Sequence, residues 1–130
     1  MATIKRFEDL EIWQEARKLS KEIITLSKTT ELKTDFKFKE QIKDSSGSVM
    51  DNIAEGFERN GNGEFRQFLS IAKGSAGETR SQAYRLFDND YINEERLKSL
   101  VTDYEKLSIK IHNFITYLNK KEYKGTKFIE

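Results

Sequence analysis

The 130-residue sequence contains no cysteine, no proline and only one histidine. Without cysteine there is no disulfide framework, thiolate zinc site or cysteine nucleophile, which fits a reducing compartment, and we expect a cytoplasmic protein. The lack of proline and the seven glycines favour long helices over a turn-rich β fold. No run approaches the roughly 18 apolar residues of a membrane span, so we expect no membrane association.

The sequence also lacks an excess of charge of one sign, because its 23 Lys and Arg residues nearly balance its 22 Asp and Glu residues, which gives a formal net charge of +1. A chain of this length suits one compact domain, residues 1–130. The composition therefore indicates a fold class but supplies no reaction.

Apolar residues recur at spacings of three and four, which is typical of helices that bury one stripe. The pattern predicts helices over about 8–28, 35–59, 63–89 and 93–121, followed by a charged C-terminal tail. Asn93 is suited to cap the last helix, whose first turn carries Glu94 and Glu95 at the positive end of the dipole. The loop after the second helix is marked by a polar, glycine-containing cluster: Asn60, Gly61, Asn62 and Gly63.

Four helices with short connections and one apolar stripe each predict an all-α, antiparallel up-down-up-down four-helix bundle. The middle of the second helix is unusual, since it has low helix propensity and little apolar surface at Ser45, Ser46, Gly47 and Ser48. Either helices approach closely there or the helix is locally loose.

Catalytic and metal-binding patterns are scarce. A di-iron bundle needs two Glu-x-x-His pairs, whereas His112 is the single histidine and Ile109 stands three positions before it. Gly61 and Gly63 precede a helix with no strand before them, so they predict a helix connection and not a phosphate loop. We expect no metal, no cofactor and no enzymatic activity.

The third predicted helix carries small residues on the side opposite its apolar stripe, and these predict a surface for close approach by a second subunit: Ser70, Gly74, Gly77 and Ser81. One flank of this side is basic, with Arg66, Lys73 and Arg80, which are also candidate nucleic-acid contacts, and the other is acidic, with Glu64 and Glu78. Complementary flanks can dock head to tail and close into a ring. The alternative is a solvated helix of ordinary mixed charge.

The fourth predicted helix has a basic stripe at helical spacing, which is a candidate surface for nucleic acid: Lys106, Lys110, Asn113, Tyr117, Lys120 and Lys124. From Lys106 onwards the chain has six lysines and two acids, so the preceding part is net negative. Such a separation can steer a polyanion, and Tyr117 could stack on an unpaired base. The alternative is a lysine-rich solvated face.

Several strings resemble a bacterial family of four-helix-bundle proteins encoded in intervening sequences of 23S ribosomal RNA genes, which is similar in turn to the accessory variability determinant of diversity-generating retroelements. The matching residues fall between Phe7 and Leu118: Phe7, Asp9, Leu10, Trp13, Gln14, Ala16, Gln41, Ile42, Asn52 to Phe57, Glu64, Phe65, Phe68, Leu69, Ile71, Ala72, Gly74 and Ser75. The most specific string is Asn-Ile-Ala-Glu-Gly-Phe, which contains Asn52, Glu55 and Gly56.

The resemblance implies a four-helix bundle, a homo-oligomer of five subunits, no known enzymatic activity, and a role in binding RNA or an RNA-processing protein. The family pattern has two basic residues after Gln-Ile, where this chain has Lys43 and Asp44. Asp44 and the near-zero charge favour the alternative, a structural or protein-interaction module with no nucleic-acid role. Within the signature, we expect Glu55 to pair with Lys or Arg and Asn52 with backbone, while Gly56 permits close packing or chain exit; alternatively, the string faces a partner.

Overall fold

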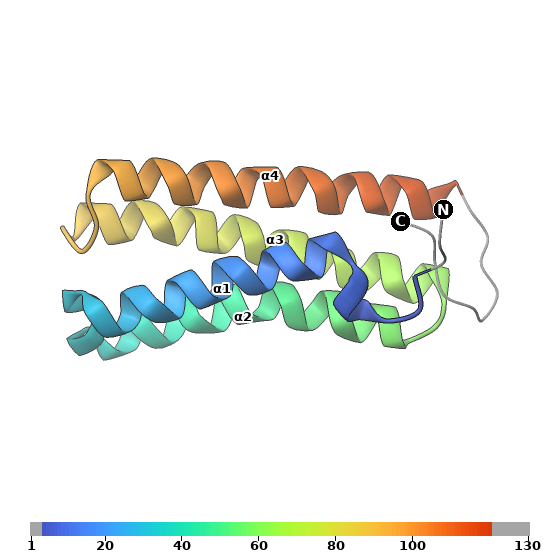
Figure 1. Ribbon diagram of the computed structural model, residues 1–130, viewed down its shortest axis with the longest axis horizontal. Coiled ribbons are helices and arrows are strands. Elements are labelled where there is room, and N and C mark those ends of the chain that lie inside the picture. Colours follow the sequence, from blue (N-terminus) through green and yellow to red (C-terminus); the bar gives the residue numbers. More distant parts are fainter. Residues whose placement is uncertain (1–3, 121–130) are drawn as a thin grey trace.

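The computed structural model describes residues 4–120, which form four long helices and two short 3-10 helices. The order is η1 (Phe7–Asp9), α1 (Glu11–Thr29), η2 (Glu31–Thr34), α2 (Phe36–Glu58), α3 (Asn62–Asp88) and α4 (Glu94–Asn119). The long helices alternate in direction along one axis, so the predicted all-α, up-down-up-down bundle is confirmed (Figure 1). None of these helices is both long and apolar enough to cross a membrane.

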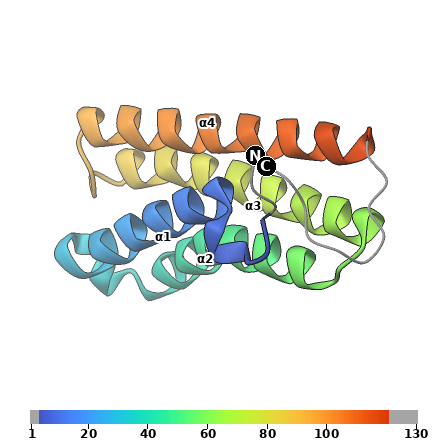
Figure 2. The same cartoon turned by 45° about the vertical axis from the view of Figure 1, so that its right-hand side comes forward.

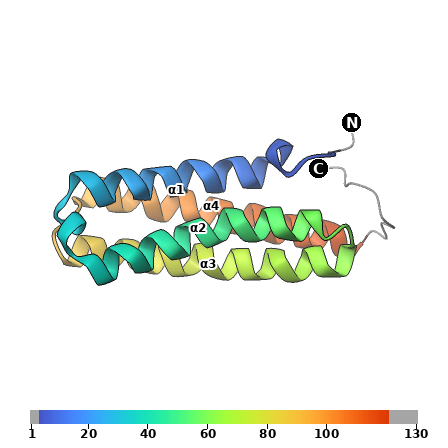
Figure 3. The same ribbon diagram turned by 90° about the horizontal axis from the view of Figure 1, so that it is seen from below.

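The arrangement places α1 beside α2 and α3 beside α4, with α2 and α3 joining the two pairs (Figures 1 and 2). Viewed from below, the connections between helices lie at the two ends of the bundle and leave its sides free (Figure 3). The connections η2 and 89–93 share one end, where Tyr91 Oη donates a hydrogen bond to Asp35 Oδ2 at 2.8 Å.

The core is built from the predicted stripes, because residues at spacings of three and four meet on one face of each helix. Its largest fully buried side chains come from all four helices, Leu10 and η2: Leu10, Ile23, Leu32, Ile42, Ile53, Phe57, Phe65, Leu69, Leu86, Leu100 and Tyr104. The rings of Phe57 and Phe65 meet edge to face with centroids 5.9 Å apart, which joins α2 to α3 near their shared loop.

The first helix begins later than its predicted boundary near residue 8. Residues 7–9 form a 3-10 turn, and the fully buried Leu10 has extended backbone, so α1 starts at Glu11. Gln14 Nε2 holds this turn by donating to the carbonyl of Glu8 at 2.8 Å, and the rings of Phe7 and Trp13 pack at 5.2 Å. The burial of Leu10 in an extended conformation therefore prevents α1 from starting before Glu11.

The caps agree with the sequence. Asn93 Oδ1 accepts a hydrogen bond from the backbone N–H of Arg96 at 2.8 Å, which caps α4 as predicted. Gly61 occupies the N-cap position of α3 with extended backbone, directly after Asn60, whose φ of 59° lies in the left-handed region. The predicted C-terminal tail after Lys120 lies outside the described residues, and so does Lys124.

Candidate functional site: the outer faces of α3 and α4

The outer face of α3, which we define as Ser70, Gly74, Gly77 and Ser81, lies on the surface. Ser70, Gly74 and Ser81 are exposed and Gly77 is half-buried. A Cβ atom added at Gly74 or Gly77 would meet no heavy atom within 4 Å. The bundle itself therefore does not require glycine at these positions, and the α3 outer face leaves room for close approach from outside.

The two flanks of the α3 outer face contact different neighbours. On the basic flank, Arg80 pairs with Glu105 of α4 at 3.3 Å, and Arg66 donates to Asn119 of α4. On the acidic flank, Glu64 accepts from Arg59 at 3.5 Å. The predicted separation of charge is present, but much of it is used within the chain. Lys73 is the exposed basic residue of the flank for which no acidic partner occurs among residues 4–120.

Two residues of the basic stripe of α4, Lys106 and Lys110, lie on the side of the helix that approaches α1. Lys110 Nζ bridges Glu11 and Glu15 of α1, the latter at 2.7 Å. The hydrogen bonds that Lys110 donates, first to Glu11 and then to Glu15, raise the pKa of Lys110 above its ordinary value. Lys110 is thus a bridge between two helices, which the sequence of α4 alone could not show.

The other members of the stripe differ in exposure. Lys106, Asn113 and Lys120 are exposed, and Lys106 borders a small hollow that it shares with Glu15, Lys18, Leu19 and Asp103. Tyr117 is half-buried, with its ring centroid 5.8 Å from that of Phe114. Lys106 and Lys120 therefore remain as cations that solvent reaches.

The signature string packs α2 against α3 and pairs locally. Glu55 accepts from Arg59 at 2.9 Å, and Asn52 Nδ2 donates to the carbonyl of Ser48 at 2.8 Å, as predicted. A Cβ on Gly56 would lie 2.6 Å from Phe68 Cβ, so this glycine permits close packing of the helices. These contacts account for the residues of the signature string as a helix-packing element and not as a set of catalytic or binding residues.

A polar seam, which pattern analysis did not identify, joins α2 and α3 at their centre. Ser45 Oγ donates to Gln82 Oε1 and accepts from Thr79 Oγ1 at 2.8 Å, while Ser48 and Ser75 share a hydrogen bond of 3.0 Å. Ser45, Thr79 and Gln82 are all at least nine-tenths buried. The serine-rich stretch of α2 is thus a site where α2 and α3 approach closely. The sequence signals for this contact were the run from Ser45 to Ser48 in α2 and the polar Thr79 within the apolar stripe of α3.

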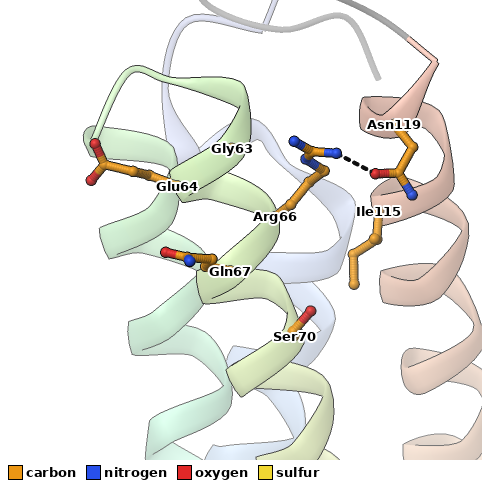
Figure 4. A pocket seen from close by; sticks show the side chains of 7 residues that line it. All are labelled: Gly63, Glu64, Arg66, Gln67, Ser70, Ile115 and Asn119. Atoms are coloured by element: carbon orange, nitrogen blue, oxygen red, sulfur yellow. Dashed lines mark hydrogen bonds between the residues drawn. The ribbon is translucent and has the colours of Figure 1, made fainter.

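A shallow groove of about 580 Å³ lies between the first turns of α3 and the end of α4 (Figure 4). The Arg66 side chain reaches from α3 toward Asn119, while Glu64 points away from α4 (Figure 4). Gln67 and Ser70 add an amide and a hydroxyl to the rim. This groove offers hydrogen bonds but no paired acid and base.

Elements of an active centre do not converge in the described chain. His112 is exposed on α4, and no hydrogen bond joins it to a carboxylate or a serine within residues 4–120. In the same range, no group of three or more His, Cys, Asp or Glu side chains is placed to hold a metal ion. The exposed candidate features of these helices are the α3 outer face, Lys73 on its basic flank, and Lys106 and Lys120 on α4.

Comparison with known proteins identifies a family and a protein of similar fold. The family model for 23S rRNA-intervening sequence proteins matches residues 8–113. A crystal structure of a protein with unknown function from the S23 ribosomal protein family of Bacteroides thetaiotaomicron is similar, with a TM-score of 0.73 and 24% sequence identity over 81% of this chain and 95% of that chain. The comparison with curated proteins gives no match.

Proposed function

The chain belongs to the family of 23S rRNA-intervening sequence proteins, and we propose that it is a non-enzymatic, self-assembling adaptor that binds RNA or an RNA-processing protein. Membership of the family does not itself supply this role. The proposed assembly is a ring of subunits, for which the resemblance to characterised relatives suggests five. Similarity to the accessory variability determinant of diversity-generating retroelements stays a prediction.

The observation that carries self-assembly is the exposed α3 outer face. Glycine in an exposed helix interior costs about 0.5–1 kcal/mol relative to alanine, yet Gly74 and Gly77 sit where an added Cβ would meet nothing in this chain. A neighbouring subunit that packs closely on this face would account for both glycines. The charges along its flanks would then orient the neighbour.

The RNA-binding part of the proposal is supported by fewer exposed cations than the sequence predicted. Lys73, Lys106 and Lys120 are exposed, whereas Lys110 and Arg80 are paired with carboxylates. These three exposed cations of the described residues lie on different sides of the bundle, so each subunit binds phosphate weakly, but repetition around an assembly would raise the avidity.

The alternative is a protein-interaction module with no nucleic-acid role. It is favoured by the pairing of Lys110 with Glu11 and Glu15, which removes the central cation of the α4 stripe. Asp44 adds to this, since it lies with Glu78 at the rim of a polar groove between α2 and α3 and would repel phosphate.

A retention experiment with the purified chain distinguishes the two functions. The protein is incubated with total cellular RNA at low salt and captured, and both bound RNA and bound protein are identified. Changing Lys73, Lys106 and Lys120 together to Glu should abolish RNA retention without altering helicity. The matched control changes three exposed lysines elsewhere, Lys5, Lys21 and Lys28, to Glu and should retain more RNA than the first variant.

For the parent, RNA affinity should fall with salt, with a log-log slope of up to about 0.7 for each phosphate neutralised on a single strand. Equal RNA retention by the two triple variants would show that the chosen lysines are a solvated face. If the parent retains no RNA at low salt but captures a protein, the interaction-module alternative is correct.

A further inference from the structure

Phe36, the first residue of α2, is the most exposed large hydrophobic side chain in the described chain, with 68% of its surface open to solvent. Lys39 Nζ lies 5.0 Å from the ring centroid, and Lys33 and Lys37 are exposed close by in sequence. Phe36 is therefore an aromatic group on a basic surface. Phe36 does not pack into the hydrophobic core.

An apolar groove of about 320 Å³ lies between the end of α3 and the start of α4. Its walls include Tyr84 and Phe87 from α3 and Leu97 and Val101 from α4, and its polar lining residues are Glu94, Lys98 and Thr102. Tyr84 keeps 49% of its surface exposed. This volume is at the lower end of the range of about 300–1,000 Å³ for ligand pockets, which suits one aromatic side chain.

Phe36 and the groove lie at the same end of the bundle. The hydrogen bond between Tyr91 and Asp35 joins the 89–93 connection to the residue that precedes Phe36, and both connections lie at one end in Figure 1. A contact between Phe36 of one copy and the groove of another would therefore keep the two bundles at the same height.

Phe36 and the groove also lie on opposite sides of the bundle. At about 100° per residue, Phe36 points about 180° away from Ser45, which contacts α3. By the same rule, Tyr84 lies about 200° from Gln82, which contacts α2. One subunit can thus present Phe36 on its α1–α2 side and receive a neighbour on its α3–α4 side.

The charges around the two features are complementary. Residues 28–43, which surround Phe36, contain five lysines and three acids. Residues 88–95, which adjoin the groove, contain four acids, of which Glu94 is paired with the groove residue Lys98 at 3.3 Å. The other three acids of this connection, Asp88, Asp90 and Glu95, are exposed and attract the lysines of another copy. Tyr84 also follows Ser81 by one helical turn, so the groove continues the α3 outer face.

We propose that Phe36 of one subunit inserts into the Tyr84–Val101 groove of a second copy and anchors head-to-tail assembly. This inference rests on the proposed self-assembly and names its surfaces. The contact is heterologous, because the two partners use different residues. Repetition of this contact at constant height gives parallel subunits, and it closes into a ring when the rotation between successive copies is a whole fraction of a turn.

Two single variants test the contact. Phe36→Ala removes the inserted ring, and Thr102→Arg places bulk and positive charge at the exposed rim of the groove. Each variant alone should lose the parent assembly and have the 15.2 kDa mass of one chain in native mass spectrometry. Ile109→Ala, which shortens another exposed apolar side chain on α4, is the matched control and should assemble like the parent.

Mixing the variants gives the sharpest result. The Phe36→Ala chain keeps its groove and the Thr102→Arg chain keeps its Phe36, so the mixture should form a one-to-one heterodimer and nothing larger. Formation of this heterodimer also shows that both variants are folded. Failure of the mixture to pair, while circular dichroism shows both variants folded, would contradict the proposal.

Other outcomes separate this inference from the proposed function. If the parent assembles and either single variant assembles equally well, the Phe36 contact is wrong while self-assembly stands. If Phe36→Ala reduces RNA retention but leaves the mass of the assembly unchanged, Phe36 is a base-stacking residue instead. A monomeric parent would overturn both proposals.

Discussion

Gly56 of α2 faces Phe68 of α3 so closely that a Cβ on the glycine would lie 2.6 Å from the Cβ of the phenylalanine. The same added atom would lie 3.0 Å from the ring of Phe65. The glycine of the family signature is therefore a packing requirement at the end of the helix pair.

We predict that Gly56→Ala destabilises the bundle. Alanine gains about 0.5–1 kcal/mol of helix propensity over glycine, but overpacking a tight core contact costs about 1–3 kcal/mol. The net loss should be about 1–2 kcal/mol in urea denaturation. Gly47→Ala, in the same helix where an added Cβ meets nothing within 4 Å, is the control and should stabilise the protein. Equal stabilisation by both substitutions would contradict the close contact.

Tyr104 supplies a second prediction. Its side chain is fully buried, and its hydroxyl has no hydrogen-bond partner within residues 4–120. Because an unsatisfied buried polar group costs about 1–3 kcal/mol, Tyr104→Phe should leave the free energy of unfolding unchanged or increase it at pH 7. A loss of more than about 1 kcal/mol would show that the hydroxyl has a partner, such as a bound water.

Burial also raises the pKa of the Tyr104 phenol above its ordinary value near 10. A folded-state pKa above the unfolded one means that the folded chain binds more protons above about pH 10. The parent should therefore lose stability as pH rises beyond that point, and Tyr104→Phe should lose less. Thermal unfolding between pH 8 and pH 11, in steps of about half a pH unit, would compare the two chains over the window that begins near pH 10.

Lys110 carries a third prediction, through its contact with Glu11 and Glu15. These hydrogen bonds raise the pKa of Lys110, so their stabilisation is present below the unfolded-state pKa near 10.4 and is lost as pH rises through the folded-state value. Since the side chain is 40% exposed, Lys110→Gln should cost no more than about 1 kcal/mol at neutral pH.

The control for Lys110 is Lys106→Gln, one turn earlier on the same helix. Chemical denaturation in urea should show the cost for Lys110→Gln alone, and 1 M salt should reduce it by screening. A cost that is the same for both lysines, or that is unaffected by salt, would mean that the contact with α1 does not stabilise the bundle.

The helices were predictable because each one carries its own signal. In α4, the period from Leu97 to Leu118 and the cap at Asn93 fix the helix without reference to any neighbour. The start of α1 was not predictable in the same way, since burial of Leu10 depends on the rest of the core. The local sequence pattern therefore predicted the four helices, and tertiary packing determined where α1 begins.

The candidate site was less predictable because it depends on contacts between helices. The α4 stripe contains Lys110, but nothing within α4 indicates that Glu11 and Glu15, about 100 residues earlier, would occupy it. The serine run in α2 left two interpretations open, and the hydrogen bonds of Ser45 to α3 decide for close approach. The small residues of α3 were correctly placed on the surface, since their position follows from helical period alone.

The mass of the purified chain in solution, measured by light scattering on a sizing column at micromolar concentration, tests self-assembly most directly. The parent should have the mass of several subunits. The pair of substitutions Gly74→Arg and Gly77→Arg should give a monomer, because a Cβ at either position meets no heavy atom of the bundle within 4 Å and the long side chains would occupy the space that a neighbour needs. Gly47→Arg, also at an open position, should assemble as the parent does. A parent of single-chain mass, or a double variant that assembles unchanged, would contradict assembly through the α3 outer face.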